Sequence, residues 1–468
     1  MIINSFEEST IRNERLPAEW QSQERLDELA DFLQANWEQR AVFYDDGQVR
    51  SRQQFIKFLG QRNIRTQNYV GSIVFNGHKL NIFPKMFRTS SEDNDTTTLD
   101  LNHLMHNLSE WVKYCNRINF PYINISSDLE DATDLRELFI SLYVRYVQAA
   151  LERGLYYQYE DITEDRQSIR GKIDFRDYVV NKLPYSKDFT FRCTYSNFEF
   201  DNIVNKIIRY TCKSLLNDTN AGNRAIIRRI LTKLNGITDV RCVPSDCDGI
   251  KLSRLNNHYS IIVSMSKMFL LNKEANYNFD NTESFCFLFP TDVLFEGFIG
   301  GFIKDVLGDA AQVTLQASDA SVFSNVIYNG QEYGEALRMR HDILVEHREH
   351  GLFVLDTKYK RIDRFEETED IADLITRETN SGDVYQVLTY ARAREIRDVY
   401  LLYPLYRLED IERGDVVGVN TTVNGNDQPV NVHFVRLPFV FEDDVENTKE
   451  KLRQVILRIF EGQQALGA

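Results

Sequence analysis

The chain has 468 residues, of which 43% are hydrophobic and 12% aromatic, and it carries a formal net charge of −15 at pH 7. This composition supports folded cores and excludes wholesale disorder, while the length exceeds one ordinary core, so we expect two or three domains. Its sequence has no apolar run near the roughly 20 residues of a membrane span and does not begin with a signal-peptide pattern. We therefore expect a cytoplasmic protein without a membrane partner.

The acidic balance limits what the chain can do with nucleic acid. Proteins that grip DNA unaided usually present a basic surface, because phosphate contacts dominate affinity. The net charge of −15 therefore predicts that another subunit delivers any DNA, or that basic residues are locally concentrated. The six cysteines lack a second Cys or His pair at zinc-site spacing, so free thiols are expected.

The first 98 residues are predicted to form an α/β domain. Helical spacing and short alternating runs predict a helix at Trp20–Trp37 and strands at Ala41–Tyr44, Val70–Phe75 and Leu80–Phe83. Asn76-Gly77, between the last two strands, is typical of a tight hairpin turn. The polar tract from Thr89 to Thr98 is expected to be an exposed loop or linker.

Residues 99–275 are expected to form a mainly helical middle domain. Its helices are predicted at Leu101–Tyr114, Leu135–Arg153, Phe200–Leu216, Ala225–Leu234 and His258–Met268. A short β-like insertion is expected near Ser168–Phe175. A polar stretch, Leu271–Ser284, marks the next boundary, so the predicted domains are 1–98, 99–275 and 276–468.

Residues 276–468 are predicted to form a mixed sheet flanked by helices. A helix from Thr291 to Leu307 should stop at Gly308, and Asp383 should cap a later helix that ends at Glu395. The remaining elements are expected to be strands at Gln312–Gln316, Val322–Tyr328, Asp398–Tyr403, Val416–Val423 and Val430–Val435, and a terminal helix at Val445–Phe460. The fold class is therefore α/β (α+β).

The most informative pattern lies between residues 340 and 360, where two apolar runs flank a polar break that ends in Gly351. This pattern predicts a β-hairpin. With a five-residue loop, Asp342 faces Asp356, and their β-carbons lie about 5 Å apart. Such carboxylates repel each other unless a cation lies between them, and Mg²⁺ prefers oxygen ligands. Lys358 shares the strand face of Asp356. A metal held by two acids beside an ammonium is suited to phosphodiester hydrolysis.

Two helices add candidate site residues. Glu296 lies in an otherwise apolar helix, where it needs a partner or a metal, although a charge at the domain surface is an equally good interpretation. Gln386 and Tyr390 share one helix face and would hold Lys358 and a backbone phosphate. The alternative for this pair is a polar helix flank with a packed tyrosine. Close packing of the Glu296 helix against the sheet is predicted at Gly297, Gly300 and Gly301.

The order of these elements (acidic helix, Asp strand, Asp-x-Lys strand, Gln-x-x-x-Tyr helix) resembles the PD-(D/E)xK nuclease superfamily. More narrowly, the chain is similar to the McrC family, the nuclease subunits of modified-cytosine restriction systems. The most specific part of the similarity is Asp356-Thr357-Lys358-Tyr359-Lys360. Other matching segments are Val70–Ile73, Ile82–Lys85, Arg170–Ile173, the helix around Asn205, and Phe295–Phe298. The family commonly has proline before its first catalytic aspartate, where this chain has His341.

The resemblance implies roles for the candidate residues. Asp342, Asp356 and the Thr357 carbonyl would coordinate Mg²⁺, for which Mn²⁺ would substitute, and Glu296 would complete or orient the site. Lys358 would position or help deprotonate the attacking water and stabilise the transition state. The activity implied is that of a Mg²⁺-dependent DNA endonuclease in an McrBC-like defence complex.

The resemblance also implies a partner, an McrB-like AAA+ hexamer that hydrolyses GTP or ATP and delivers modified double-stranded DNA. Residues 1 to 270 would dock on this motor and stimulate it. The sequence itself has no Gly-x-x-x-x-Gly-Lys-Ser/Thr loop, so the chain should not hydrolyse nucleotide. Two alternatives stay open, a nuclease-dead adaptor of the motor and a free-standing Cas4/RecB-like exonuclease. The second often carries an iron–sulfur cysteine set, which is missing here.

Overall fold

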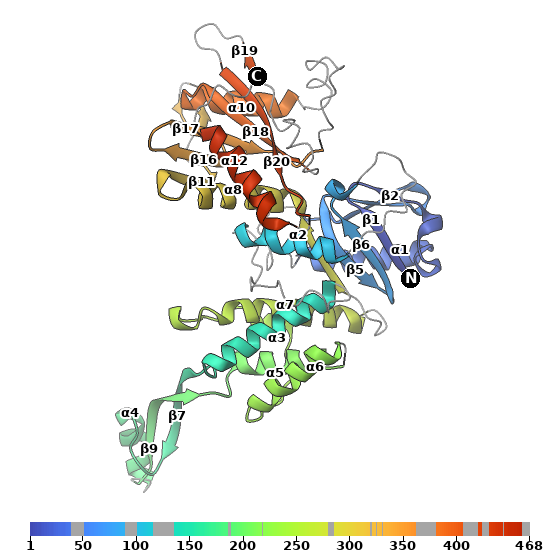
Figure 1. Cartoon of the computed structure of the whole chain (residues 1–468). Helices are drawn as coiled ribbons and strands as arrows, with labels where there is room; N and C mark the ends of the chain where they lie inside the picture. The colour runs from blue at the N-terminus through green and yellow to red at the C-terminus, as the bar shows by residue number, and fades with distance from the viewer. Residues whose placement is uncertain are drawn as a thin grey trace. The chain divides into compact units, whose positions relative to one another are not determined.

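The computed structural model describes residues 1–38, 51–88, 101–115, 135–185, 189–217, 219–278, 285–318, 321–323, 325–329, 331–361, 381–405, 420–423, 430–442 and 444–460. Contacts divide the chain into two compact units, the first formed by Met1–Asp131 with Phe285–Ala468 and the second by Ala132–Ser284 (Figure 1). The expected strand at Ala41–Tyr44 and the tract from Thr89 to Thr98 lie outside the described residues.

The first unit contains a four-stranded sheet near the N-terminus, in the order β1-β6-β5-β10. Its strands are β1 (Ile2–Phe6), β5 (Tyr69–Phe75), β6 (His78–Phe83) and β10 (Phe285–Pro290). Asn76 and Gly77 both have positive φ, 49° and 71°, as a two-residue hairpin turn of this kind requires. The predicted Asn-Gly hairpin is therefore confirmed, whereas β10 reaches this sheet from far along the chain.

A smaller sheet and one helix accompany these strands. The sheet is β2 (Thr10–Ile11), β4 (Ile64–Thr66) and β3 (Ile56–Phe58), in that order. The predicted N-terminal helix is present as α1 (Gln23–Glu38), which begins three residues later than expected at Trp20. Its buried Phe32 stacks on Phe75 of β5, with ring centroids 5.4 Å apart, so α1 covers the four-stranded sheet.

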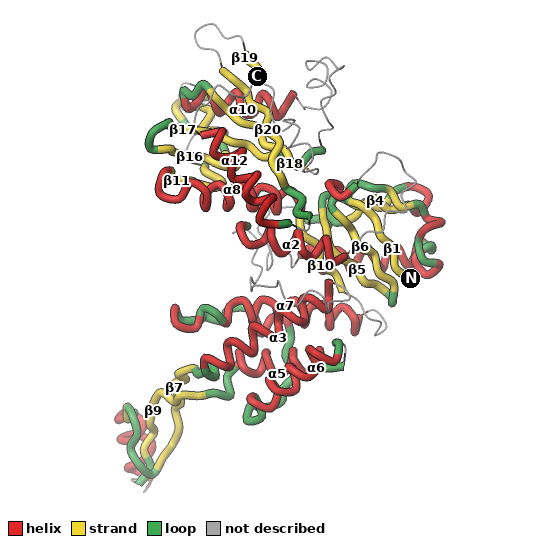
Figure 2. Tube along the Cα trace, in the orientation of Figure 1, coloured by secondary structure: helices red, strands yellow, loops and turns green. Residues whose placement is uncertain are grey.

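The first unit also contains a six-stranded mixed sheet, which confirms the predicted mixed α/β class. Its strands, in spatial order, are β11 (Ala311–Ala317), β16 (His341–His347), β17 (Gly351–Thr357), β18 (Asp398–Leu405), β20 (Val430–Pro438) and β19 (Asn420–Val423). β17 runs antiparallel to β16 and parallel to β18. Figure 2 shows these strands between helices.

Helices cover both faces of the six-stranded sheet. Leu344, Val354 and Leu401 share a buried cluster with Val387 and Tyr390 of α10 (Ser381–Arg394), so α10 covers that face. The other face is covered by α8 (Thr291–Leu307) and α12 (Val445–Phe460), which contact β11 and β20 respectively. Both latter helices have the predicted bounds.

Of three local predictions for this part of the chain, one is confirmed and two need correction. Gly308 does end α8, with a φ of 45°. Asp383 does not cap α10, because the helix already begins at Ser381 and the Asp383 carboxylate instead accepts a hydrogen bond from Lys360. The expected strand at Val322–Tyr328 is broken into β12 (Ser321–Phe323) and β13 (Ile327–Tyr328), which pair with β15 (Ala336–Arg338) and β14 (Gln331–Glu332).

The prediction that three glycines of α8 pack closely against the sheet is correct for only one of them. A β-carbon at Gly300 would contact Leu315 of β11, as expected. At Gly297 and Gly301, however, it would overlap Cys115 and the backbone carbonyl of Tyr114, at the end of α2 (Leu101–Tyr114). These two glycines therefore allow close approach of α2, which packs on α8 within the first unit.

We expect Gly301→Ala to lower the free energy of unfolding by about 1–3 kcal/mol, because the added methyl overlaps a backbone oxygen that cannot rotate away. Thermal unfolding of the full chain measures this effect. Gly222→Ala in α6 (Ala221–Lys233) is the matched control, since its β-carbon would meet only Asn220 Oδ1, at 3.4 Å. A Gly301→Ala protein as stable as the control would refute the packing argument.

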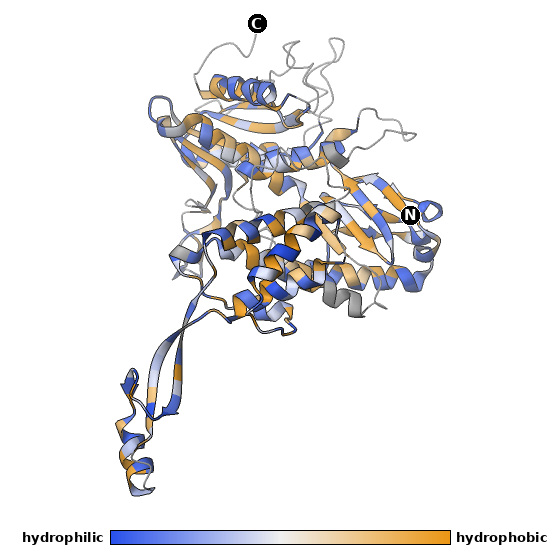
Figure 3. Cartoon of the chain, turned by 60° about the horizontal axis from the view of Figure 1, so that its bottom comes forward, coloured by the Kyte–Doolittle hydropathy of each residue, from blue (hydrophilic) through white to orange (hydrophobic). Residues whose placement is uncertain are grey.

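Among its described residues, the second unit has four long helices, a long hairpin and, near the hairpin end, the short helix α4 (Phe175–Asp177). The long helices are α3 (Leu135–Arg153), α5 (Ile203–Leu215), α6 (Ala221–Lys233) and α7 (Tyr259–Asn278). The hairpin pairs β7 (Gln158–Arg166) with β9 (Phe191–Glu199), and β8 (Lys172–Ile173) pairs with β9. It is much longer than the insertion predicted near Ser168–Phe175. Figure 3 shows it extending away from the helices of its unit.

The start of the predicted polar boundary is helical. α7 continues ten residues past Met268, to Asn278, and so includes Leu271, where the polar boundary was predicted to begin. Strong helix formers in this stretch (Leu, Lys, Glu, Ala) outweigh the loss of apolar spacing. The three-domain division stays a prediction, although contacts group α2 and β10 with the first unit. The six cysteines are buried free thiols. None of the helices that the structure describes has the length and apolar content of a bilayer crossing.

Candidate active site

The predicted hairpin register is present in β16 and β17. Ile343 pairs with Leu355, Leu344 with Val354 and Glu346 with Leu352, as the sequence predicted. The loop is shorter than the five residues expected, because His347 and Gly351 also pair. The pairing ends at Ile343 and Leu355, so the next residues across the two strands are Asp342 and Asp356. These aspartates share the sheet face of Leu344 and Val354, which α10 covers.

Asp342 is held at the end of β17 by Thr357. The backbone N–H and the hydroxyl of Thr357 both donate to Asp342 Oδ2, each at 2.9 Å. The sequence predicted only a role for the Thr357 carbonyl, so this side-chain contact was missed. The two donors fix the orientation of the Asp342 carboxylate before any ligand binds.

Asp356 is the most deeply buried acid of the site, with 1% of its surface exposed. Burial and the neighbouring Asp342 carboxylate raise the pKa of Asp356 to about 7, although Lys358 opposes them. Asp356 Oδ2 forms an ion pair with Lys358. Its Oδ1 is buried and has no hydrogen-bond partner among the residues that the structure describes. An unpartnered buried carboxylate oxygen is costly, and it is a suitable ligand for a cation.

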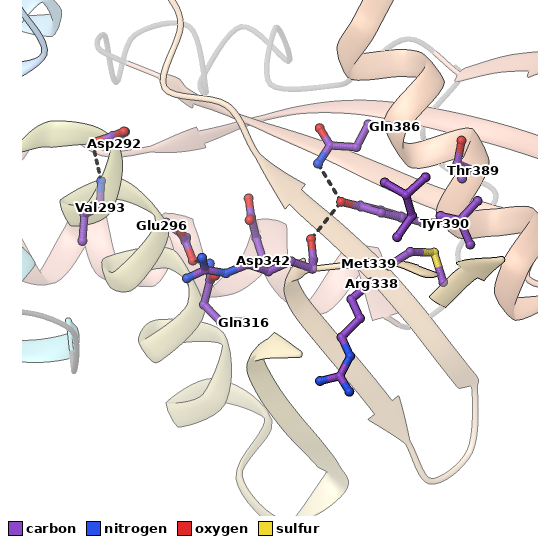
Figure 4. Close-up of a pocket in the computed structure, with 13 residues that line it drawn as sticks. Asp292, Val293, Glu296, Gln316, Arg338, Met339, Asp342, Gln386, Thr389 and Tyr390 are labelled. Carbon is purple, nitrogen blue, oxygen red and sulfur yellow. Dashed lines mark hydrogen bonds between the residues drawn. The ribbon is translucent and has the colours of Figure 1, made fainter. Parts of the chain in front are cut away.

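Lys358 is held by the two helix residues that the sequence singled out. Its Nζ donates to Gln386 Oε1 at 3.2 Å, and Gln386 Nε2 lies 2.6 Å from the Tyr390 hydroxyl. That hydroxyl donates to the Arg340 carbonyl at 2.8 Å, which connects α10 to the start of β16 (Figure 4). Burial disfavours the ammonium, but the Asp356 carboxylate outweighs it and raises the pKa of Lys358. The lysine is therefore a cation.

His341, where the family commonly has proline, is fully buried and packs edge-on against Tyr390, with ring centroids 4.4 Å apart. Arg394 Nε donates to His341 Nε2 at 3.0 Å, so Nε2 acts as the acceptor and carries no hydrogen. The histidine thus fastens α10 to β16 and leaves Asp342 in place. At the far end of β16, His347 stacks on His350 of the hairpin loop, with ring centroids 4.7 Å apart.

A cavity of about 500 Å³ brings most of the candidate residues together. Its walls include Glu296 of α8, Asp342 of β16, and Gln386 and Tyr390 of α10 (Figure 4). Sequence reasoning missed further lining residues, namely Asp292, Gln316, Arg338, Met339 and Arg340. Asp356 and Lys358 are not part of the wall, but Lys358 contacts it through Gln386.

Glu296 does not join the two aspartates in a compact set. Its Oε1 accepts a hydrogen bond from Gln316 Nε2, on the wall of the cavity. Within the described part of the chain, no three His, Cys, Asp or Glu side chains converge closely enough to hold a metal. The structure therefore assembles the opposed aspartates, the lysine, the glutamine and the tyrosine, and places Glu296 across the same cavity.

The sheet and site together define an α/β protein with a candidate hydrolytic centre, two opposed aspartates and an Asp-x-Lys strand. The profile described as McrBC 5-methylcytosine restriction system component matches residues 64–404. Because this match covers well over half of the sequence, the chain belongs to that family.

Solved structures give a second comparison. One is described as a refined half-complex from the tetradecameric assembly of Thermococcus gammatolerans McrB AAA+ hexamers with bound McrC. It is similar over 98% of this chain and 100% of that chain, with a TM-score of 0.64 and 15% identity. A second, of the Thermococcus gammatolerans McrBC complex, has a TM-score of 0.47, with 17% identity over 66% of this chain and 88% of that chain. No curated protein sequence matches the chain. The first likeness establishes a shared fold.

Proposed function

We propose that this chain is the Mg²⁺-dependent DNA endonuclease subunit of an McrBC-like restriction complex and that its centre is of the PD-(D/E)xK type. The observation that carries the proposal is the opposed pair Asp342 and Asp356 beside Lys358. The lysine donates a hydrogen bond to Gln386, which is bonded to Tyr390, and this glutamine and tyrosine line the cavity. Cleavage would depend on an AAA+ NTPase partner, which the chain would in turn stimulate.

The donor set fits a magnesium ion. Asp342, Asp356 and the Thr357 carbonyl would hold it, and the buried, unpartnered Asp356 Oδ1 is available as a ligand. Mg²⁺ usually keeps several waters and takes only one or two carboxylates besides substrate phosphates, so a third acid is not required. When bound, the metal would lower the pKa of its water and screen the scissile phosphate.

The chain's own residues would bind and orient the substrate. Asp356 keeps Lys358 protonated. The role of the lysine is therefore to position the attacking water and stabilise developing negative charge rather than to accept a proton. Gln386 and Tyr390 fix the lysine from the α10 side. Arg338 and Arg340, on the same cavity wall, would contact neighbouring phosphates of the DNA backbone.

The partner is inferred from the solved relative, whose McrC is bound to McrB AAA+ hexamers. The second unit of this chain presents a surface for such a partner at the end of the β7–β9 hairpin. Seven large apolar residues there are 49–70% exposed, and we call them the hairpin tip: Ile169, Phe175, Val179, Val180, Leu183, Tyr185 and Phe189. Apolar residues gathered on a surface mark interaction sites, so we propose that the tip docks on the motor.

Co-expression with an McrB-like AAA+ protein tests the proposal. The complex should be recovered in a pull-down, hydrolyse nucleotide faster than the motor alone, and cut cognate DNA in the presence of Mg²⁺. Nucleotide turnover without cleavage would instead identify a nuclease-dead adaptor. Digestion of DNA ends without the motor would identify a free-standing exonuclease.

Magnesium affinity should depend on pH. Because burial and Asp342 raise the pKa of Asp356 to about 7, protons compete with the metal below that pH, and we expect the apparent affinity to fall about tenfold per pH unit. Above pH 7 the affinity should level off. Isothermal titration calorimetry of the isolated chain from pH 5 to 8.5 measures this, with Asp356→Asn as the variant whose weak binding should not follow that slope. A flat profile in the wild type would contradict the site.

A further inference from the structure

Outside the candidate site, Glu7 is a buried carboxylate at a junction of the first unit. It follows β1 and is 2% exposed. Its Oε1 accepts hydrogen bonds from the Lys85 backbone N–H at 2.8 Å and the Tyr359 hydroxyl at 2.6 Å, and its Oε2 accepts one from the Thr291 hydroxyl at 2.6 Å. A glutamate is rarely buried this far unless its oxygens are satisfied. Here three donors satisfy them.

Two of the three donors adjoin candidate site residues, and the third belongs to the N-terminal part of the chain. Tyr359 directly follows Lys358, and Thr291 is the first residue of α8, the helix of Glu296. Lys85 follows β6 of the N-terminal sheet, and its Nζ lies 4.7 Å from the Tyr359 ring centroid. One carboxylate therefore joins the N-terminal sheet, the end of the lysine strand and the start of the acidic helix.

The strand end needs such an anchor. β17 ends at Thr357, so Lys358 and Tyr359 lie beyond it. There the Lys358 N–H donates to the Leu402 carbonyl and the Lys360 N–H to the Lys358 carbonyl, both at 2.8 Å. A displacement of about 1 Å in a reacting group can cost on the order of a hundredfold in rate. Contacts that hold Tyr359 therefore control where the Lys358 ammonium lies.

We propose that Glu7 is a positioning residue of the cleavage site: from the N-terminal sheet it fixes Lys358, through Tyr359, and the start of α8, through Thr291. This inference rests on the proposed function. It makes the N-terminal sheet part of the cleavage machinery. Burial raises the pKa of Glu7 to about 7, an effect that Lys85 and the three donors partly offset. Glutamine, neutral and of the same shape, is therefore the conservative replacement.

Hydrogen–deuterium exchange of the full chain tests the anchor without any need for catalysis. In Glu7→Leu, the amides of Lys358 and Lys360 should exchange about tenfold faster, whereas Glu7→Gln should restore slow exchange. Tyr359→Phe removes only the hydroxyl and keeps the ring, and it should show the same faster exchange. It replaces Glu7→Leu in the test if that variant folds poorly. Ser72→Ala is the control, since this buried β5 residue bonds Asn81 within the N-terminal sheet alone. Unchanged exchange in both Glu7→Leu and Tyr359→Phe would overturn the proposal.

The kinetic arm uses the complex with its motor. Glu7→Leu and Tyr359→Phe should lower kcat for cleavage about tenfold or more with KM and nucleotide turnover unchanged, and Glu7→Gln should keep wild-type kcat. Equal loss in Ser72→Ala, or loss of kcat in Glu7→Gln as large as in Glu7→Leu, would reduce Glu7 to a merely structural residue. A wild-type complex that cuts no DNA would refute the proposed function, and the exchange result would still decide whether Glu7 anchors the strand.

Discussion

Asp356→Asn is expected to reduce DNA cleavage by the assembled complex about a thousandfold or more, because it removes a charged ligand and leaves the fold intact. The asparagine has nearly the same shape and removes a buried carboxylate whose Oδ1 is unpartnered, which offsets the loss of the ion pair with Lys358, so the variant should stay folded. Lys358→Ala should cost about 10²–10³-fold, the usual loss for one preorganised group that stabilises transition-state charge. Single-turnover cleavage assays with saturating motor and Mg²⁺ measure both.

Matched substitutions separate this chemistry from general damage. Lys360→Ala removes a lysine two residues away that pairs with Asp383. Asp398→Asn changes an aspartate of the same sheet that is 43% exposed and paired with His433. Both controls should cut within about threefold of wild type, since Lys360 and Asp398 pair with Asp383 and His433, which are not candidate site residues. Full cutting by Lys358→Ala would remove the lysine from the mechanism, and unchanged cutting by Asp356→Asn would show that the cleavage centre lies elsewhere.

The parts of the site that sequence could predict follow from short-range periodicity. The pairing of Leu344 with Val354 followed from an assumed five-residue loop between two apolar runs. It survives the error in loop length because shortening both ends of the loop equally leaves the register unchanged. Gln386 and Tyr390 could be placed on one helix face because they are four residues apart. Local spacing was sufficient for these contacts.

The contacts that sequence reasoning missed are long-range or lack an apolar pattern. Nothing near Phe285–Pro290 indicates that β10 pairs with β5, and nothing near Glu7 indicates Tyr359, 352 residues away. β7 is rich in charged residues and shows no apolar alternation for a strand prediction to detect. β9 does alternate from Phe191 to Ser196, a signal that the sequence prediction overlooked. Glu296 was identified from its apolar helix, but its partner Gln316 lies on a different element and gave no local signal.

Replacing three residues of the hairpin tip, Phe175, Val179 and Tyr185, by serine is expected to abolish motor binding and stimulation. Each side chain is at least 57% exposed, so the folded chain loses little from the change. An apolar or aromatic anchor at an interface typically contributes about 2 kcal/mol or more, and loss of three would weaken binding by on the order of a thousandfold or more. Pull-down and nucleotide-turnover titrations with the motor measure this loss.

The control for the tip variant is Val240→Ser, because Val240 is an exposed apolar residue of the same unit outside the hairpin. It should bind and stimulate like wild type. The tip variant and Asp356→Asn should also differ in kind: the first loses nucleotide stimulation and therefore cleavage, whereas the second keeps stimulation and loses cleavage alone. Normal stimulation by the tip variant would show that the motor docks elsewhere, and the exposed apolar residues would then need another partner.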